Sequence, residues 1–207
     1  YLGAKQHKLI ENETGFTTKY VQDLYVSKDL NFRPVDLEFA PDGSLYVADW
    51  QNALIGHMQH SARDPLRDHK HGRIYRITYP SRPLVKPAKI DGASIDQLLA
   101  NLTLPEYRTR YRTRRELRER DGVEVAKAAS VWAAKQSDHR LKLEALWVTW
   151  GADQVDADLL NELSQSNDHR IRAAAVRVAR FNEHKLANLT EILSRAANDN
   201  HGRARPE

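Results

Sequence analysis

The spacing of apolar residues changes once along this chain of 207 residues. In the first part, apolar and polar residues alternate over short runs such as 35–39, which is typical of half-buried strands. In the second part, apolar residues recur every three or four positions, which is typical of amphipathic helices. Between the two parts, residues 79–87 contain three prolines, which continue neither a helix nor a strand ladder. The sequence therefore predicts an α+β fold in two segments, 1–87 and 88–207.

The first segment is expected to contain short antiparallel strands joined by turns. Residues 41–44 read Pro-Asp-Gly-Ser, a tight-turn signal with glycine where a positive φ is needed. A sheet of about four strands has the size of one propeller blade, and such a sheet cannot close on itself. We therefore interpret this segment as an antiparallel β-propeller blade fragment, the C-terminal portion of a larger propeller. The expected strands cover residues 20–26, 35–39, 44–50 and 72–78.

The second segment contains a short repeat. Its clearest copy, Asp138-His139-Arg140, recurs thirty positions later as Asp168-His169-Arg170. Both aspartates are expected to be helix N-caps, and the histidines to belong to the turn before each helix. Helix pairs that recur every ~30–45 residues are typical of a HEAT-like α-solenoid, which we predict here in truncated form. The copies lie at 137–142 and 167–172, with weaker ones at 200–205 and from 112–114.

Composition restricts the chemistry that the chain can perform. There is no cysteine, which excludes disulfides, thiolate metal sites and thiol nucleophiles within these residues. No apolar run approaches the ~18 residues that span a bilayer, so no transmembrane segment is expected. No nucleophilic triad, phosphate-binding glycine loop or Rossmann fingerprint stands out. The sequence therefore identifies no catalytic residue.

Seven arginines fall within thirteen residues, interleaved with two tyrosines. Basic residues with aromatic neighbours can bind nucleic acid. On a helix, however, these arginines would point to several faces, and nearby acids could pair with them at i, i+3 or i, i+4. We interpret the segment as a solvated or domain-docking helix and do not expect nucleic acid as a partner. The arginines are Arg108, Arg110, Arg112, Arg114, Arg115, Arg118 and Arg120, and the tryptophans expected in the helical core are Trp132, Trp147 and Trp150.

The loop from residue 57 to residue 71 concentrates histidine, aspartate and arginine. Neutral imidazole and carboxylate groups could ligate a divalent metal there. Alternatively, arginine–carboxylate pairs such as Arg63 with Asp68, or Asp64 with Arg67, could hold the loop in shape. A partner-binding surface is a third interpretation. The candidate metal ligands are His57, His60, Asp64, Asp68, His69 and His71.

Asp36, Asp49 and Arg73 are the candidate cofactor-binding residues. The two aspartates lie at expected strand ends, where a propeller would line its central funnel. For Asp49 the alternative is a local turn onto Trp50, because aspartate commonly caps turns.

Four stretches of the first segment resemble one protein family: residues 32–36, 41–50, 55–59 and 63–76. They are similar to the large planctomycete and verrucomicrobial proteins classed as membrane-bound dehydrogenases, and the resemblance covers roughly residues 15–205. It implies a glucose/sorbosone-dehydrogenase-like β-propeller, then HEAT repeats, then a c-type cytochrome domain with a Cys-x-x-Cys-His haem site.

The resemblance implies a function for a parent protein larger than this chain. That parent would be a periplasmic, quinoprotein-like sugar or alcohol dehydrogenase with PQQ and calcium, passing electrons to a c-type haem. The haem motif is not in this chain, which has no cysteine. The chain is thus expected to be inactive alone, with the remaining propeller blades and the cytochrome domain as partners. The alternative is a non-catalytic propeller and HEAT scaffold that binds a protein or a carbohydrate.

Overall fold

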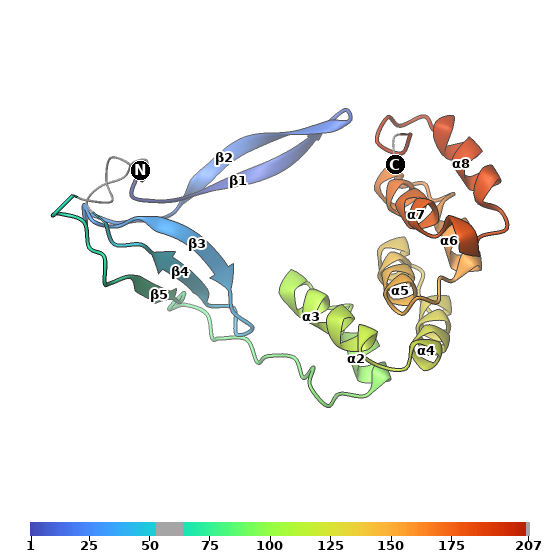
Figure 1. Cartoon of the computed structure of the whole chain (residues 1–207), viewed down its shortest axis with the longest axis horizontal. Coiled ribbons are helices and arrows are strands. Elements are labelled where there is room, and N and C mark those ends of the chain that lie inside the picture. The colour runs from blue at the N-terminus through green and yellow to red at the C-terminus, as the bar shows by residue number, and fades with distance from the viewer. Residues whose placement is uncertain (53–63, 206–207) are drawn as a thin grey trace. The chain divides into compact units, whose positions relative to one another are not determined.

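The computed structural model describes residues 1–52 and 64–205 of the chain. These residues form two compact units, one made of residues 1–10, 16–52 and 64–87 and the other of residues 11–15 and 88–205. The first unit contains strands and the second contains helices (Figure 1). The α+β class predicted from the change of period agrees with this content.

The strand-containing unit has two separate sheets. Strands β1 (Gly3–Asn12) and β2 (Gly15–Val26) form a two-stranded sheet, and neither pairs with another strand of the described residues. Strands β3 (Pro34–Phe39), β4 (Leu45–Asp49) and β5 (Arg73–Ile77) form an antiparallel sheet in the order β3-β4-β5.

The turn between β3 and β4 forms where the sequence predicts it. Gly43 has φ +82°, and the Ser44 N–H donates to Asp42 Oδ1 at 2.9 Å. The Ala40 N–H closes the turn by donating to the Ser44 carbonyl at 2.8 Å. A local signal of turn residues therefore sufficed to place this hairpin.

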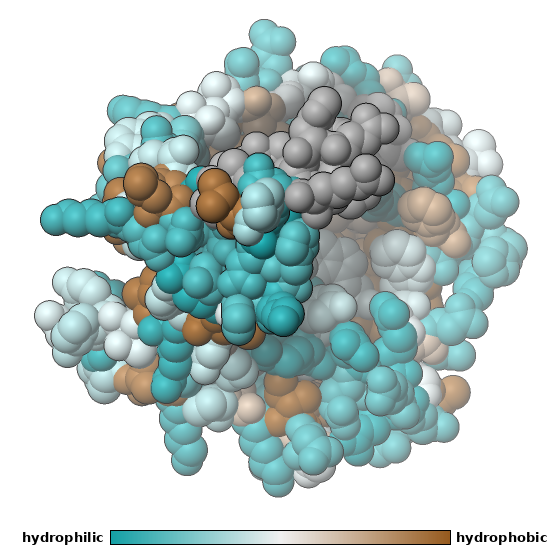
Figure 2. Space-filling model, turned by 60° about the vertical axis from the view of Figure 1, so that its left-hand side comes forward, coloured by the Kyte–Doolittle hydropathy of each residue, from teal (hydrophilic) through white to brown (hydrophobic). Residues whose placement is uncertain are grey.

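The core of the three-stranded sheet is small. Phe32, Leu45 and Val47 are buried, and Leu2 and Tyr25 pack against them partly exposed. Many other apolar side chains of this unit reach the surface, where Figure 2 shows hydrophobic patches among hydrophilic ones.

The predicted propeller blade is wrong. A blade needs one continuous sheet of four strands, but in the described residues the sheet that contains β4 has only the three strands β3, β4 and β5. The expected strand at 20–26 lies within β2, which pairs with β1 instead of joining β3. Alternating apolar residues specify that a segment is extended, but they do not specify its neighbour.

The other unit is helical. Its first helix, α2, begins with a capping box, in which the Gln97 N–H donates to Ser94 Oγ and the Ser94 N–H donates to Gln97 Oε1. The helices are α2 (Ile95–Asn101), α3 (Tyr107–Arg118), α4 (Gly122–Ala134), α5 (His139–Gly151), α6 (Ala157–Leu163), α7 (His169–Phe181) and α8 (Leu189–Ala197), with a 3₁₀ turn η1 (Glu183–Lys185) before α8.

Two clusters of buried side chains hold these helices together. One centres on Leu98, Leu99 and Leu117, and the other on Leu146 and Leu160. None of the helices in the described part of the chain has both the length and the apolar character needed to cross a membrane.

The predicted HEAT-like solenoid is also wrong. Asp138 and Asp168 do cap α5 and α7, accepting from the N–H groups of Arg140 and Arg170 at 2.8 and 2.9 Å. The copy at 200–205 forms a turn without a helix, and the one at 112–114 lies inside α3. The recurring sequence is therefore a signal for starting a helix, and it does not mark a repeated pair of helices.

Candidate functional site

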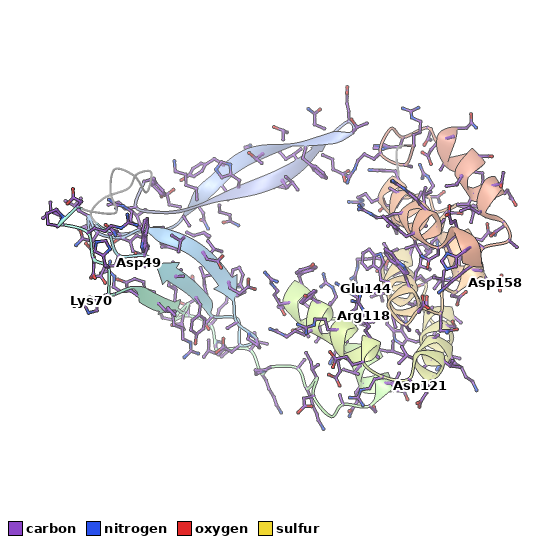
Figure 3. All side chains as sticks on the ribbon, in the orientation of Figure 1. Asp49, Lys70, Arg118, Asp121, Glu144 and Asp158 are labelled. Carbon is purple, nitrogen blue, oxygen red and sulfur yellow. The ribbon has the colours of Figure 1, made fainter. Side chains whose placement is uncertain are left out.

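A buried carboxylate joins helix α3 to helix α5. The side chain of Glu144 is 4% exposed and receives Arg110 Nε at 3.1 Å and Arg114 Nη1 at 2.5 Å. Figure 3 shows Glu144 on α5, on the side that faces α3. A carboxylate taken out of water needs such partners, since an unpaired buried charge is strongly destabilising. The pair fixes the two helices that frame a groove.

This groove has a volume of about 680 Å³ and lies between α3 and the end of α5. Small-molecule sites commonly have about 300–1,000 Å³. Gly151 lies against Arg118, whose Nε would be 3.5 Å from a Cβ at that position. The side chains around the groove are mainly aromatic and basic. The groove is lined by Tyr111, Arg114, Arg115, Arg118, Trp147, Trp150, Gly151 and Asp153.

The aromatic side chains of the groove are held by ring contacts. The Arg114 guanidinium lies 5.5 Å from the centre of the Trp147 ring. Trp150 stacks on Phe181 with 6.0 Å between ring centres. The prediction that Trp147 and Trp150 are core residues was incomplete, because both are only half-buried and line the groove as well as packing against the core.

The arginines of α3 differ in whether an acid neutralises them. Arg110 and Arg114 share Glu144, Arg112 lies 3.8 Å from Glu106, and Arg120, just beyond the end of α3, pairs with Glu116. Two others, Arg115 and Arg118, are exposed and have no carboxylate partner within residues 1–52 and 64–205. These two guanidinium groups give the groove a positive charge that the fold does not use.

Asp153 is the only acid lining the groove in the described part of the chain. The Lys185 ammonium donates to its carboxylate and, at 2.9 Å, to its carbonyl oxygen. This ammonium group holds the pKa of the Asp153 carboxyl below its usual range. Because Asp153 is ionised and already paired, it reduces the positive charge of the groove only in part.

Two of the three candidate cofactor residues come together in the other unit. Asp49 is fully buried, and Arg73 Nε and Nη2 both lie 2.7 Å from its Oδ2. Its Oδ1 accepts the N–H groups of Arg33 and Gln51 at 2.7 and 2.9 Å. The local-turn interpretation of Asp49 therefore describes its contacts, with Gln51 in place of Trp50 as the donor.

Asp29 completes this network and was missed by the sequence reasoning. Arg73 Nη1 lies 2.7 Å from Asp29 Oδ2. Hydrogen bonds from the Asn31 N–H and from Arg73 hold the pKa of Asp29 below its usual range. Its separation of 44 residues from Arg73 gives no local signal of the pair. Asp29 and Asp49 together occupy the guanidinium group of Arg73.

Asp36 lies apart from this network. It pairs in register with Ala48, the residue before Asp49, so its side chain projects from the opposite face of the sheet. Asp36 is exposed, and its Oδ1 accepts the N–H of Leu37 at 2.8 Å. The structure therefore does not bring the three candidate cofactor residues to one site.

The candidate metal ligands are only partly described. His57 and His60 lie outside the described residues. Within 64–71, Asp64 accepts the Leu66 N–H, and Asp68 accepts the Lys70 N–H and lies 2.9 Å from His71 Nδ1. The hydrogen bond from the Lys70 N–H holds the pKa of the Asp68 carboxyl below its usual range. Desolvation raises this pKa, but by a smaller amount. His69 does not join Asp68 and His71 to make a metal site. No group of three or more potential metal ligands occurs in the described residues.

A serine, a histidine and a glutamate also meet between α5 and α6. His139 Nδ1 lies 2.8 Å from Ser166 Oγ, and its Nε2 lies 3.8 Å from Glu162 Oε1. This chain of contacts from serine to histidine to glutamate resembles a nucleophilic triad. However, Ser166 is 3% exposed, and its Oγ also accepts a hydrogen bond from the Asp168 N–H. No substrate can reach a hydroxyl buried in this way, so the contact serves to connect two helix starts.

Comparison with known proteins adds one match. Residues 4–81 match the model of a domain of unknown function (DUF7133). The matched residues include β3, β4 and β5 and end before the helices that form the groove. Searches of the curated proteins and of the solved structures return no match.

Proposed function

We propose that the helical unit is a non-catalytic binding module that takes an anionic ligand into the groove between α3 and α5. The observation that carries the proposal is that Arg115 and Arg118, which pair with no carboxylate among the described residues, line the groove together with Trp147 and Trp150. Guanidinium groups bind carboxylates, sulfates or phosphates through paired, charge-assisted hydrogen bonds. Aromatic rings beside them add apolar contact area for the rest of the ligand.

The distribution of acids supports binding over a structural role for these two arginines. Of the acids near α3, Glu144 and Glu116 are paired with other arginines, and Asp153 is paired with Lys185. Two like charges three positions apart on one helix face repel each other and lower helix stability slightly. A ligand that carries negative charge would relieve that repulsion.

The dehydrogenase function implied by the resemblance is a separate proposal, and it rests on the motifs of residues 32–76. Asp49 and Arg73 lie in that stretch and bind each other and Asp29. In this arrangement they hold the end of the sheet together. A redox role would have to involve groups beyond the described part of this chain.

Titration with 2-naphthalenesulfonate, a flat anionic probe, tests the binding proposal by isothermal calorimetry. We expect the double variant Arg115→Gln/Arg118→Gln to bind at least about ten-fold more weakly, since a hydrogen bond to a charged group contributes about 1.5–3 kcal/mol. Arg112→Gln is the matched control, because Arg112 lies on the same helix outside the groove lining and should leave the affinity unchanged. Equal affinity of the double variant and the unmodified protein would contradict the proposal.

A further inference from the structure

We propose that the ligand of this groove is an acidic sugar, a pyranose that carries a carboxylate. The inference rests on the proposed function, because it names the ligand class for the same groove. Three features of the lining lead to it: aromatic side chains, two guanidinium groups that pair with no carboxylate among the described residues, and one carboxylate, that of Asp153.

The aromatic faces suit a ring with an apolar side. Tyr111, Trp147 and Trp150 come from two helices and line one groove. The C–H groups on one face of a pyranose pack against the π-electrons of an indole, while its hydroxyls point outward along the ring edge. The stack on Phe181 covers one face of the Trp150 ring and holds the ring in place. A rigid aromatic surface loses little conformational freedom when a ligand binds.

The free guanidinium groups limit the charge of the ligand. Arg115 and Arg118 can pair with one or two carboxylates, since a guanidinium fork matches a planar carboxylate in two parallel hydrogen bonds. A nucleic acid interface typically neutralises several phosphates along the backbone, about six to ten in well-studied cases. The other lining arginine, Arg114, is already bound to Glu144. The charge count therefore favours a small carboxylate ligand over a nucleic acid.

The single acid distinguishes a sugar from an aromatic carboxylate. Asp153 would repel a ligand whose only polar groups were anionic. It would accept hydrogen bonds from a ligand that also carries hydroxyl donors, and its side chain is 86% exposed. Lys185 binds its Oδ1, so Oδ2 is available as an acceptor. A lining that offers both donors and an acceptor beside flat rings corresponds to the groups of a uronic acid.

Calorimetry with trigalacturonate tests the inference, with fully methyl-esterified trigalacturonate as the matched neutral ligand. We expect the acid to bind at least about ten-fold more tightly than the ester. Arg118→Lys should weaken trigalacturonate several-fold while it changes 2-naphthalenesulfonate less than about two-fold, because lysine keeps the charge but loses the planar fork.

A tryptophan pair serves as the second set of variants. Trp150→Ala should reduce the affinity for trigalacturonate about ten-fold and Trp150→Phe should reduce it less, while Trp50→Ala, in the other unit, should leave it unchanged. Circular dichroism of each variant checks that the helices are intact. If Trp150→Ala does not fold, the Trp150→Phe and Arg118→Lys results decide.

The outcomes separate the two proposals. Binding of 2-naphthalenesulfonate without binding of trigalacturonate would overturn the sugar inference and leave the binding module standing. Binding of neither would overturn both. Equal affinity for the acid and its methyl ester, or tighter binding of a ten-residue thymidine oligonucleotide than of trigalacturonate, would also overturn the sugar inference.

Discussion

Each unit of this protein buries one carboxylate against arginine, but the surroundings of the two pairs differ. Asp49 and Glu144 have side chains that are 0% and 4% exposed, and both accept charge-assisted hydrogen bonds. Around Asp49 the nearby guanidinium of Arg73 is shared between two aspartates. Beside Glu144, helix α3 contributes two further arginines, Arg115 and Arg118, that pair with no carboxylate among the described residues. We therefore interpret a buried ion pair as a structural contact. The arginines beside it that have no carboxylate partner are the candidates for binding a ligand.

The largest effect is expected at Glu144. Glu144→Ala would leave the partly buried guanidinium groups of Arg110 and Arg114 without their shared carboxylate. We expect a loss of about 3–5 kcal/mol in the free energy of unfolding of the helical unit. Urea unfolding followed by circular dichroism at 222 nm measures it. A loss below about 1 kcal/mol would show that water or another group already screens this pair.

Asp49 should be the next most sensitive position. Asp49→Asn keeps the shape of the side chain but removes the charge that faces Arg73, and we expect a loss of about 2–3 kcal/mol. Hydrogen exchange of the β4 and β5 amides reports it directly. The affinity for 2-naphthalenesulfonate should stay unchanged, because Asp49 does not line the groove. A change in that affinity would contradict the interpretation that the Asp49–Arg73 pair is structural and does not contribute to ligand binding.

Local signals in the sequence predicted local structure well. The aspartate caps of α5 and α7 and the turn at Gly43 all form as expected. Each depends on residues within a few positions of one another, so the sequence contains the whole interaction. The same reasoning failed where a segment had to choose a distant partner, as when β2 paired with β1.

The candidate site shows the same limit. The sequence drew attention to the arginine cluster, but the spacing of arginines alone could not separate Arg114 from Arg115. Glu144, which makes that distinction, lies 30 residues from Arg114. Asp49 and Arg73 were singled out together, but the reason was an expected funnel, and Asp29 was missing from the set. Only the three-dimensional neighbours show which charges are neutralised.

A third arginine–carboxylate pair, at the end of the helical unit, extends the comparison to pH. Arg172 Nε and Nη2 donate to Asp199 at 2.6 and 2.8 Å, and the Arg172 guanidinium lowers the pKa of the Asp199 carboxyl to about 2. In the unfolded chain this pKa is about 3.9. The stabilisation is therefore fully present above about pH 5 and is lost as pH falls from about 4 towards 2.

The Asp199→Asn variant should remove this part of the acid sensitivity. We expect it to be about 2 kcal/mol less stable than the unmodified protein at pH 7 and to converge with it below about pH 2. Urea unfolding at a series of pH values measures both curves. Parallel curves over the whole range would mean that Asp199 has the same pKa in the folded and unfolded states. Asp168, whose pKa Arg170 likewise lowers to about 2, would still contribute in both proteins.

The smallest expected effect, and the only one of opposite sign, is at the unneutralised pair. Arg115→Gln/Arg118→Gln removes two exposed charges three positions apart, so we expect the helical unit to gain about 0.2–0.5 kcal/mol in stability. Arg110→Gln on the same helix should instead destabilise it, because it takes a partner from Glu144. Urea unfolding at low salt, where exposed charges are least screened, measures the difference. A loss above about 1 kcal/mol in the double variant would assign these arginines to the fold. A gain in stability together with a loss of ligand affinity is what a binding role predicts.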